Sequence, residues 1–199
     1  MLAGARRQGA LALPAPASLA GLFAEVAAGT PVIILQNLSL AIAPRWHYAV
    51  VVGYDREKSE VILRSGPNRR EVMAMSTFEH TWARSDYWGM LILRPGSLPQ
   101  SASPQALEKS LTQLEKFATP AAMHGWYTEA ARRWPDSLVF MIGRGNAAYA
   151  IGQTDDAEQA FRIAAERHPR SAVALNNLAT LLLQRGRPDE ALAIAERAV

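Results

Sequence analysis

Hydrophobic residues follow two different patterns along the 199-residue chain, and the change falls near residue 100. Before it, short aliphatic runs alternate with Gly, Pro and Asn, which is typical of strands joined by turns. After it, alanine-rich segments carry apolar residues three and four positions apart, as amphipathic helices do. The segment between them, 95–104, is rich in Pro, Gly and Ser. We therefore expect two domains, 1–99 and 100–199.

The first domain is predicted to combine helices with an antiparallel sheet. Ser18 is a suitable N-cap for a helix that begins at Leu19 and stops at Gly29. A second, short helix is expected to begin at Ser76. Neighbouring strands joined by short turns pair antiparallel, so the fold class expected here is α+β. The predicted strands are 31–36, 47–53, 60–64, 70–75 and 88–93.

The second domain repeats itself at a fixed spacing. Residues of similar type recur 34 positions apart. Tyr127 corresponds in this way to Phe161, and the small residue Gly145 corresponds to Ala179. Ala198 is related in the same way to two earlier alanines. This period and these residue types resemble tetratricopeptide repeats, helix pairs that stack into an all-α solenoid. The predicted repeats are 104–137, 138–171 and 172–199.

The net charge and the lengths of the apolar runs exclude several classes of partner. The formal net charge is only +3. The one small basic cluster, Arg64, Arg69 and Arg70, lacks the interleaved aromatic residues of a nucleic-acid site, so we expect a solvated turn there and no nucleic acid. No apolar run approaches the length of about 18 residues that a membrane-spanning helix needs. We therefore expect no membrane span in this chain.

The reactive side chains are few. The sequence contains no cysteine, which removes disulfides, cysteine zinc sites and a cysteine nucleophile. His80, His124 and His168 have no partner at metal-ligand spacing. We expect no metal and no cofactor.

One string in the first domain resembles a known family. His47 opens a buried apolar strand that continues through Gly53 and Tyr54 to Asp55. With the flanking runs 31–36 and 61–65, this string resembles the bacteriocin-processing (double-glycine leader) peptidases, which are papain-like cysteine peptidases. The resemblance covers only the later half of that peptidase domain. It implies a papain-like half-domain followed by the tetratricopeptide repeats, a layout similar to that of one bacterial peptidase family.

The resemblance also implies roles for two residues. The histidine at the position of His47 is the family's general base, which activates a cysteine carried by an upstream helix. The residue that orients this histidine falls near Ser65, which cannot act as a carboxylate. The domain is therefore expected to be cysteine-peptidase-like without its nucleophile. The alternative is a fragment of an active cysteine peptidase whose nucleophile lies upstream of Met1.

The repeats offer a candidate binding surface. The first helices of such units line the concave side of the solenoid, and amides suit a peptide backbone because they both donate and accept hydrogen bonds. Ile142 stands where peptide-clamping members often have a lysine, so a dicarboxylate clamp is not expected. We therefore expect a protein- or peptide-interaction module. The candidate peptide-binding residues are Asn146, Tyr149, Asn176, Asn177 and Gln184.

The sequence leaves the compartment open. The first seven residues place their charges late and have no apolar segment after them, so they do not form a signal peptide. They have the pattern of the middle of a helix. The protein is expected to be cytoplasmic if Met1 is the true start, and periplasmic or membrane-anchored if an upstream export signal is missing. A half-domain exposes apolar surface where its missing helix would pack, which predicts self-association.

Overall fold

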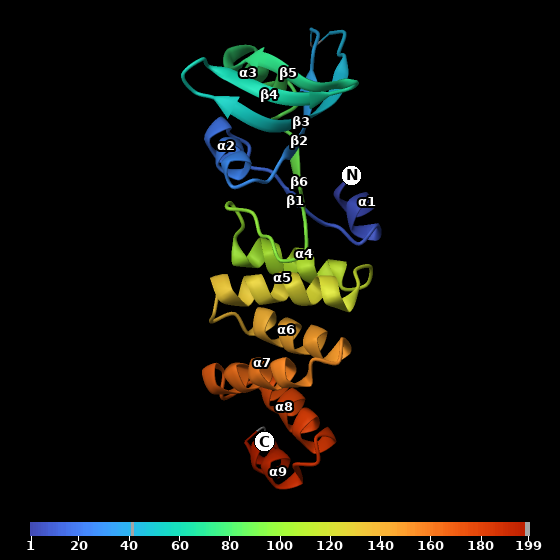
Figure 1. Cartoon of the computed structure of the whole chain (residues 1–199), viewed down its shortest axis with the longest axis vertical. Coiled ribbons are helices and arrows are strands. Elements are labelled where there is room, and N and C mark those ends of the chain that lie inside the picture. Colours follow the sequence, from blue (N-terminus) through green and yellow to red (C-terminus); the bar gives the residue numbers. More distant parts are fainter. Residues whose placement is uncertain (41, 198–199) are drawn as a thin grey trace. The chain divides into compact units, whose positions relative to one another are not determined.

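The chain forms two compact units (Figure 1). The computed structural model describes residues 1–40 and 42–197, so Ala198 of the predicted repeat lies outside the described residues. Met1–Arg94 and Pro99–Ser103 form the first unit, whereas Pro95–Leu98 and the chain from Pro104 onward form the second. The expected division at 99/100 lies within the region where short segments of the two units alternate along the chain, and it stays a prediction. The bounds of the three repeats also stay predictions.

The first unit contains a six-stranded sheet, and its neighbouring strands all pair antiparallel. Its spatial order is β1-β6-β2-β3-β4-β5. This sheet, together with the helical repeat region that follows, confirms the α+β expectation. The strands are β1 (Leu11–Pro14), β2 (Val32–Asn37), β3 (Trp46–Asp55), β4 (Glu60–Ser65), β5 (Asn68–Ala74) and β6 (Gly89–Leu93).

Among the described residues of this unit, two helices share a core with the sheet. They are α2 (Leu19–Ala27) and α3 (Met75–Ala83), and a further helix is α1 (Leu2–Arg7). The Ser18 side chain caps α2, as predicted, by accepting a hydrogen bond from the Gly21 backbone at 3.2 Å. Alternate strand residues point to one face of a sheet. There they pack against residues of α2 and α3 in one cluster that includes Leu22, Phe23, Phe78 and Trp82.

The sequence did not indicate strand β1 or the role of Glu25. Strand β1 is only four residues long and pairs with β6, far along the chain, so no local pattern marks it. Glu25 is fully buried in α2, and its carboxylate accepts hydrogen bonds from the backbone N–H groups of Gln100 and Ser101 at 3.0 and 2.7 Å. These bonds explain why residues 99–103 belong to the first unit.

The second unit is a stack of helices (Figure 1). Structural features recur in it at the predicted repeat spacing. The side chains of Ser137 and Ser171 both cap helices, and Gly152 and Gly186 both have the positive φ that favours glycine. In the described residues the helices are α4 (Pro104–Leu114), α5 (Pro120–Arg133), α6 (Leu138–Ala150), α7 (Thr154–Arg167), α8 (Ala172–Gln184) and α9 (Pro188–Glu196).

Aromatic rings pack on glycines where the helices approach most closely. A methyl group at Gly145 would overlap the ring of Phe161, and one at Gly143 would overlap the ring of Tyr127. Both rings are almost completely buried, and they occupy equivalent positions of successive repeats. Phe161 belongs to a cluster that joins α6, α7, α8 and α9. The glycines therefore let each ring fill the space between two helices.

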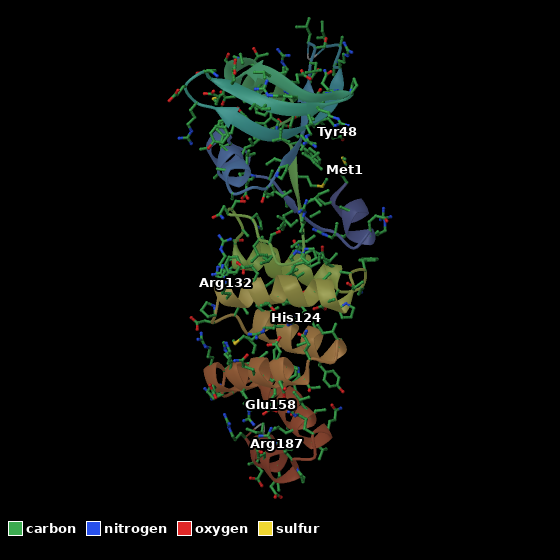
Figure 2. The ribbon with its side chains drawn as sticks, in the orientation of Figure 1. Met1, Tyr48, His124, Arg132, Glu158 and Arg187 are labelled. Carbon is green, nitrogen blue, oxygen red and sulfur yellow. The ribbon has the colours of Figure 1, made fainter. Side chains whose placement is uncertain are left out.

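A network of charges joins the last three helices of this unit. Glu158 is buried in α7 and accepts hydrogen bonds from Arg162, Arg185 and Arg187, each at 2.8 Å. Figure 2 labels Glu158 and Arg187 in this part of the unit. Burial raises the pKa of Glu158, but the hydrogen bonds from Arg162 and Arg187 lower it more, so its pKa lies below the usual range. The charged carboxylate therefore stabilises the fold.

Glu158→Gln should lower the free energy of unfolding at neutral pH by about 1–3 kcal/mol, because the amide keeps the shape but loses the charge-assisted hydrogen bonds. A lowered pKa means that this stabilisation is complete above the ordinary glutamate pKa of about 4.3 and is lost as the pH falls through the lower value of the folded state. The difference between wild type and variant should therefore shrink in acid. Urea unfolding at several pH values measures it.

Glu166→Gln is the matched control, because Glu166 lies on the same helix and is exposed. It should change the unfolding free energy by less than about 0.5 kcal/mol. A Glu158→Gln effect no larger than that of the control, or one that does not depend on pH, would contradict the assigned role of the network.

Candidate functional site

The second unit contains a groove between α6 and α8. It has a volume of about 170 Å³. Its floor contains Phe161 and Leu181, which are 4% and 2% exposed. Its walls carry amide, hydroxyl and phenol groups, and no carboxylate, ammonium or guanidinium of the described residues is part of the lining. The lining residues are Asn146, Tyr149, Phe161, Asn177, Thr180, Leu181 and Gln184.

Helical spacing brings these side chains to the groove. Asn146 and Tyr149 are three residues apart on α6, so they lie on one helix face. Asn177, Thr180 and Gln184 form the corresponding row on α8. The two rows meet where the Asn177 side-chain nitrogen donates a hydrogen bond to the Asn146 side-chain oxygen at 3.3 Å. Since each amide has further donor or acceptor capacity, both can still bind a ligand.

The structure brings together four of the five candidate peptide-binding residues. Asn146, Tyr149, Asn177 and Gln184 all line the groove, whereas Asn176 does not. Asn176 is one residue away from Asn177, which on a helix turns its side chain by about 100°. Sequence reasoning missed Thr180, although it occupies the position equivalent to Asn146 in the next repeat and the repeat spacing was enough to find it.

A second hollow continues the surface from Asn146 towards α5. It has a volume of about 210 Å³, and its lining includes Glu115, Tyr127 and Ala147. The Tyr127 hydroxyl donates a hydrogen bond to the Glu115 carboxylate at 2.5 Å. Burial raises the pKa of Tyr127, and the hydrogen bond to Glu115 raises it further. This phenol therefore remains protonated, and its hydrogen bond is made to Glu115. The amides that keep spare hydrogen-bonding capacity line the first groove.

In the first unit the structure brings His47 and Ser65 together. His47 Nε2 lies 2.7 Å from the Ser65 hydroxyl oxygen. Strand alternation places His47 on the same face of β3 as the buried residues Ala49 and Val51. Across the β2–β3 pair its partner is Gln36, whose amide nitrogen donates to the Thr81 hydroxyl at 2.6 Å.

The His47–Ser65 pair has limited chemistry. A serine hydroxyl can orient an imidazole, but it carries no charge that would stabilise an imidazolium ion as a carboxylate does. The chain contains no thiol for this imidazole to activate. The structure thus shows an imidazole and a hydroxyl group in hydrogen-bond contact, in a chain that contains no thiol.

A histidine, a carboxylate and a guanidinium group interact between helices of the second unit. His124 Nε2 lies 2.6 Å from an Asp156 carboxylate oxygen, and Arg144 is ion-paired with the same carboxylate. Burial raises the pKa of Asp156, but hydrogen bonds from His124 and Arg144 lower it more, so the net shift is downward. The three side chains come from α5, α6 and α7 (Figure 2 labels His124), which indicates a structural role.

The described residues offer neither a metal-binding cluster nor a membrane-spanning helix. No group of three or more His, Cys, Asp or Glu side chains within residues 1–40 and 42–197 could hold a metal ion. In the same part of the chain, no helix combines the length and apolar character needed to cross a bilayer.

Comparisons with known proteins identify the class of the repeat region. The family model of the tetratricopeptide repeat matches residues 142–199, so this segment consists of such repeats. The recurring caps, glycines and buried aromatic rings are the structural counterpart of this match. No curated protein matches the chain.

Solved structures of MamA are similar to parts of the chain. A MamA mutant is 23% identical with a TM-score of 0.39, and the match covers 48% of this chain and 80% of that one. A structure titled MamA AMB-1 is 17% identical with a TM-score of 0.44, and the match covers 63% of this chain and 60% of that one. At these values the likeness supports no functional argument. The peptidase-like interpretation of the first unit rests on its sequence resemblance.

Proposed function

We propose that the chain is a protein-interaction module and that the groove between α6 and α8 binds an extended peptide segment of a partner. The observation that carries this proposal is the convergence of Asn146, Tyr149, Asn177 and Gln184 on one groove with an apolar floor. Tetratricopeptide repeats in this region favour a protein partner.

The chemistry of the groove defines the kind of peptide that fits. The amides can exchange hydrogen bonds with the N–H and C=O groups of an extended backbone. The floor of Phe161 and Leu181 suits one aliphatic or aromatic side chain of the ligand. Ile142 packs against the core where a cation would be needed to clamp a carboxylate. The ligand is therefore a neutral segment held by amides, and its affinity should depend only weakly on salt.

The Asn146→Ala, Asn177→Ala double variant should bind such a peptide about tenfold more weakly, because each lost hydrogen bond contributes about 0.5–1.5 kcal/mol. A peptide array probed with wild type identifies binders, and fluorescence anisotropy of those peptides gives the dissociation constants. Asn176→Ala is the matched control, since Asn176 is an exposed amide of α8 outside the groove. It should bind like wild type.

Two results would exclude this groove. If the double variant and Asn176→Ala bind every peptide equally, the amides are ordinary surface residues. If affinity falls steeply with salt, arginines bind the ligand and the ligand class is acidic.

For the first unit we propose a papain-like half-domain of cysteine-peptidase ancestry that lacks its nucleophile and serves as a scaffold. The 2.7 Å contact between His47 and Ser65 supports it, because these are the positions of the family's base and orienting residue. The corresponding division of the chain is 1–99 for this domain and 100–199 for the repeats. The alternative is a fragment of an active peptidase, and an in-frame Gln and Cys-Gly coding sequence upstream of Met1 would favour it.

The chain should not cleave peptides, because His47 has no thiol to activate. The measurement is digestion of a broad peptide library between acidic and mildly alkaline pH, followed by mass spectrometry. Cleavage that survives serine- and metalloprotease inhibitors and disappears in His47→Ala would overturn the scaffold assignment. The same digestion by wild type and His47→Ala would instead reveal a contaminating protease.

A further inference from the structure

The loop between β2 and β3 exposes large apolar side chains to water. Leu40 and Ile42 in this loop are 63% and 91% exposed. At the start of β3, Trp46 is 53% exposed and Tyr48 is also exposed (Figure 2 labels Tyr48). Single exposed apolar residues are common on protein surfaces, but several on one short loop indicate a contact surface. We call Leu38, Leu40, Ile42, Trp46 and Tyr48 the apolar tip.

The loop that carries the apolar tip is held at its base. The Asn37 side-chain oxygen accepts hydrogen bonds from the backbone N–H groups of Ser39 and Arg45 at 3.0 and 2.9 Å. The Arg84 guanidinium donates to the backbone oxygen atoms of Asn37 and Ser39 at 3.3 and 2.8 Å. The tip is therefore presented on a fixed frame, and its exposure is a property of the fold.

Arginines gather at the same edge of the sheet. Strands β2 and β4 both pair antiparallel with β3, so they run in the same direction and their last residues lie at one edge. Arg64 near the end of β4 and Arg69 and Arg70 near the start of β5 are all exposed, and the loop before β3 contributes Arg45. Within the described residues none of these four guanidiniums forms a salt bridge.

Acidic residues are sparse around this edge. Residues 36–54, which include the whole apolar tip, contain no Asp or Glu, and neither does the segment 64–70 that joins β4 to β5. Glu71, half-buried on β5, directly follows Arg70, and the exposed Asp86 lies two residues after Arg84, whereas Glu60 lies at the opposite end of β4. The surface thus combines protruding apolar and aromatic side chains with an excess of positive charge.

An anionic lipid surface matches this combination. Leu, Ile and Trp side chains enter the boundary between headgroups and acyl chains, where Trp and Tyr are enriched, and arginines beside them bind lipid phosphates. A fluid bilayer also accepts a protruding tip without a preformed cavity. We propose that the apolar tip inserts into the headgroup layer of an anionic membrane while Arg45, Arg64, Arg69 and Arg70 contact its phosphates.

Vesicle flotation tests the proposal directly. The chain should float with vesicles of phosphatidylcholine and phosphatidylglycerol but only weakly with phosphatidylcholine alone, and salt should weaken binding to the anionic vesicles. Leu40→Ser with Ile42→Ser should reduce the partition coefficient by about tenfold or more. Leu183→Ser with Leu192→Ser is the matched control, because both leucines are 61% exposed in the second unit. The control should bind like wild type.

Two further variants separate insertion from charge. Anionic vesicles should shift the tryptophan emission of wild type to shorter wavelength, and Trp46→Phe should remove this shift. Arg69→Gln with Arg70→Gln should weaken binding several-fold without abolishing the shift at saturating lipid. Circular dichroism confirms that each variant folds.

Three outcomes would overturn the proposal. Equal binding to neutral and anionic vesicles would exclude the arginines, and equal loss in the tip and control variants would exclude the tip. An absence of vesicle binding would exclude the membrane altogether. If the chain does not bind vesicles but self-associates, and Ile42→Ser abolishes the self-association, the apolar tip is a contact between copies of the chain.

Discussion

The packing of the Phe161 ring on the backbone at Gly145 is the interaction on which the repeat region depends. Because Gly145 has no side chain, α6 and α7 can approach until the ring lies between them, and Phe161 then also contacts the cluster that includes α8. The same ring forms part of the groove floor. One buried side chain therefore sets both the spacing of the helices and the shape of the candidate binding surface.

The repeat region could be predicted because its determinants recur locally. The caps Ser137 and Ser171, the glycines at the helix ends and the aromatic positions all follow one repeat spacing. Four of the five amide and phenol residues proposed from the sequence line the groove, and Asn176 lies outside it. Periodicity determines which face of a helix packs against the next helix. The side chains of two consecutive residues on a helix, however, point in directions about 100° apart around its axis.

The first unit was harder to predict because its decisive contacts join residues that are distant in sequence. Strand β1 pairs with β6, and the buried Glu25 carboxylate binds the backbone at Gln100 and Ser101. Neither contact leaves a local signal. The pairing of His47 with Ser65 was inferred from a family resemblance. In the structure the two side chains are in contact, and the chain contains no cysteine. The apolar tip and the arginines are separated in sequence, and only the pairing of β2 and β4 with β3 brings them to one edge of the sheet.

A double-mutant cycle between Gly145 and Phe161 tests the central claim most directly. Urea unfolding gives the free energies of wild type, Gly145→Ala, Phe161→Leu and the double variant. We predict that Gly145→Ala destabilises the wild type, because overlap with the ring outweighs a helix-propensity gain of about 1 kcal/mol. In the Phe161→Leu background, the same substitution should be neutral or stabilising, with a coupling energy of about 1–2 kcal/mol. Additive effects of the two substitutions would contradict the account.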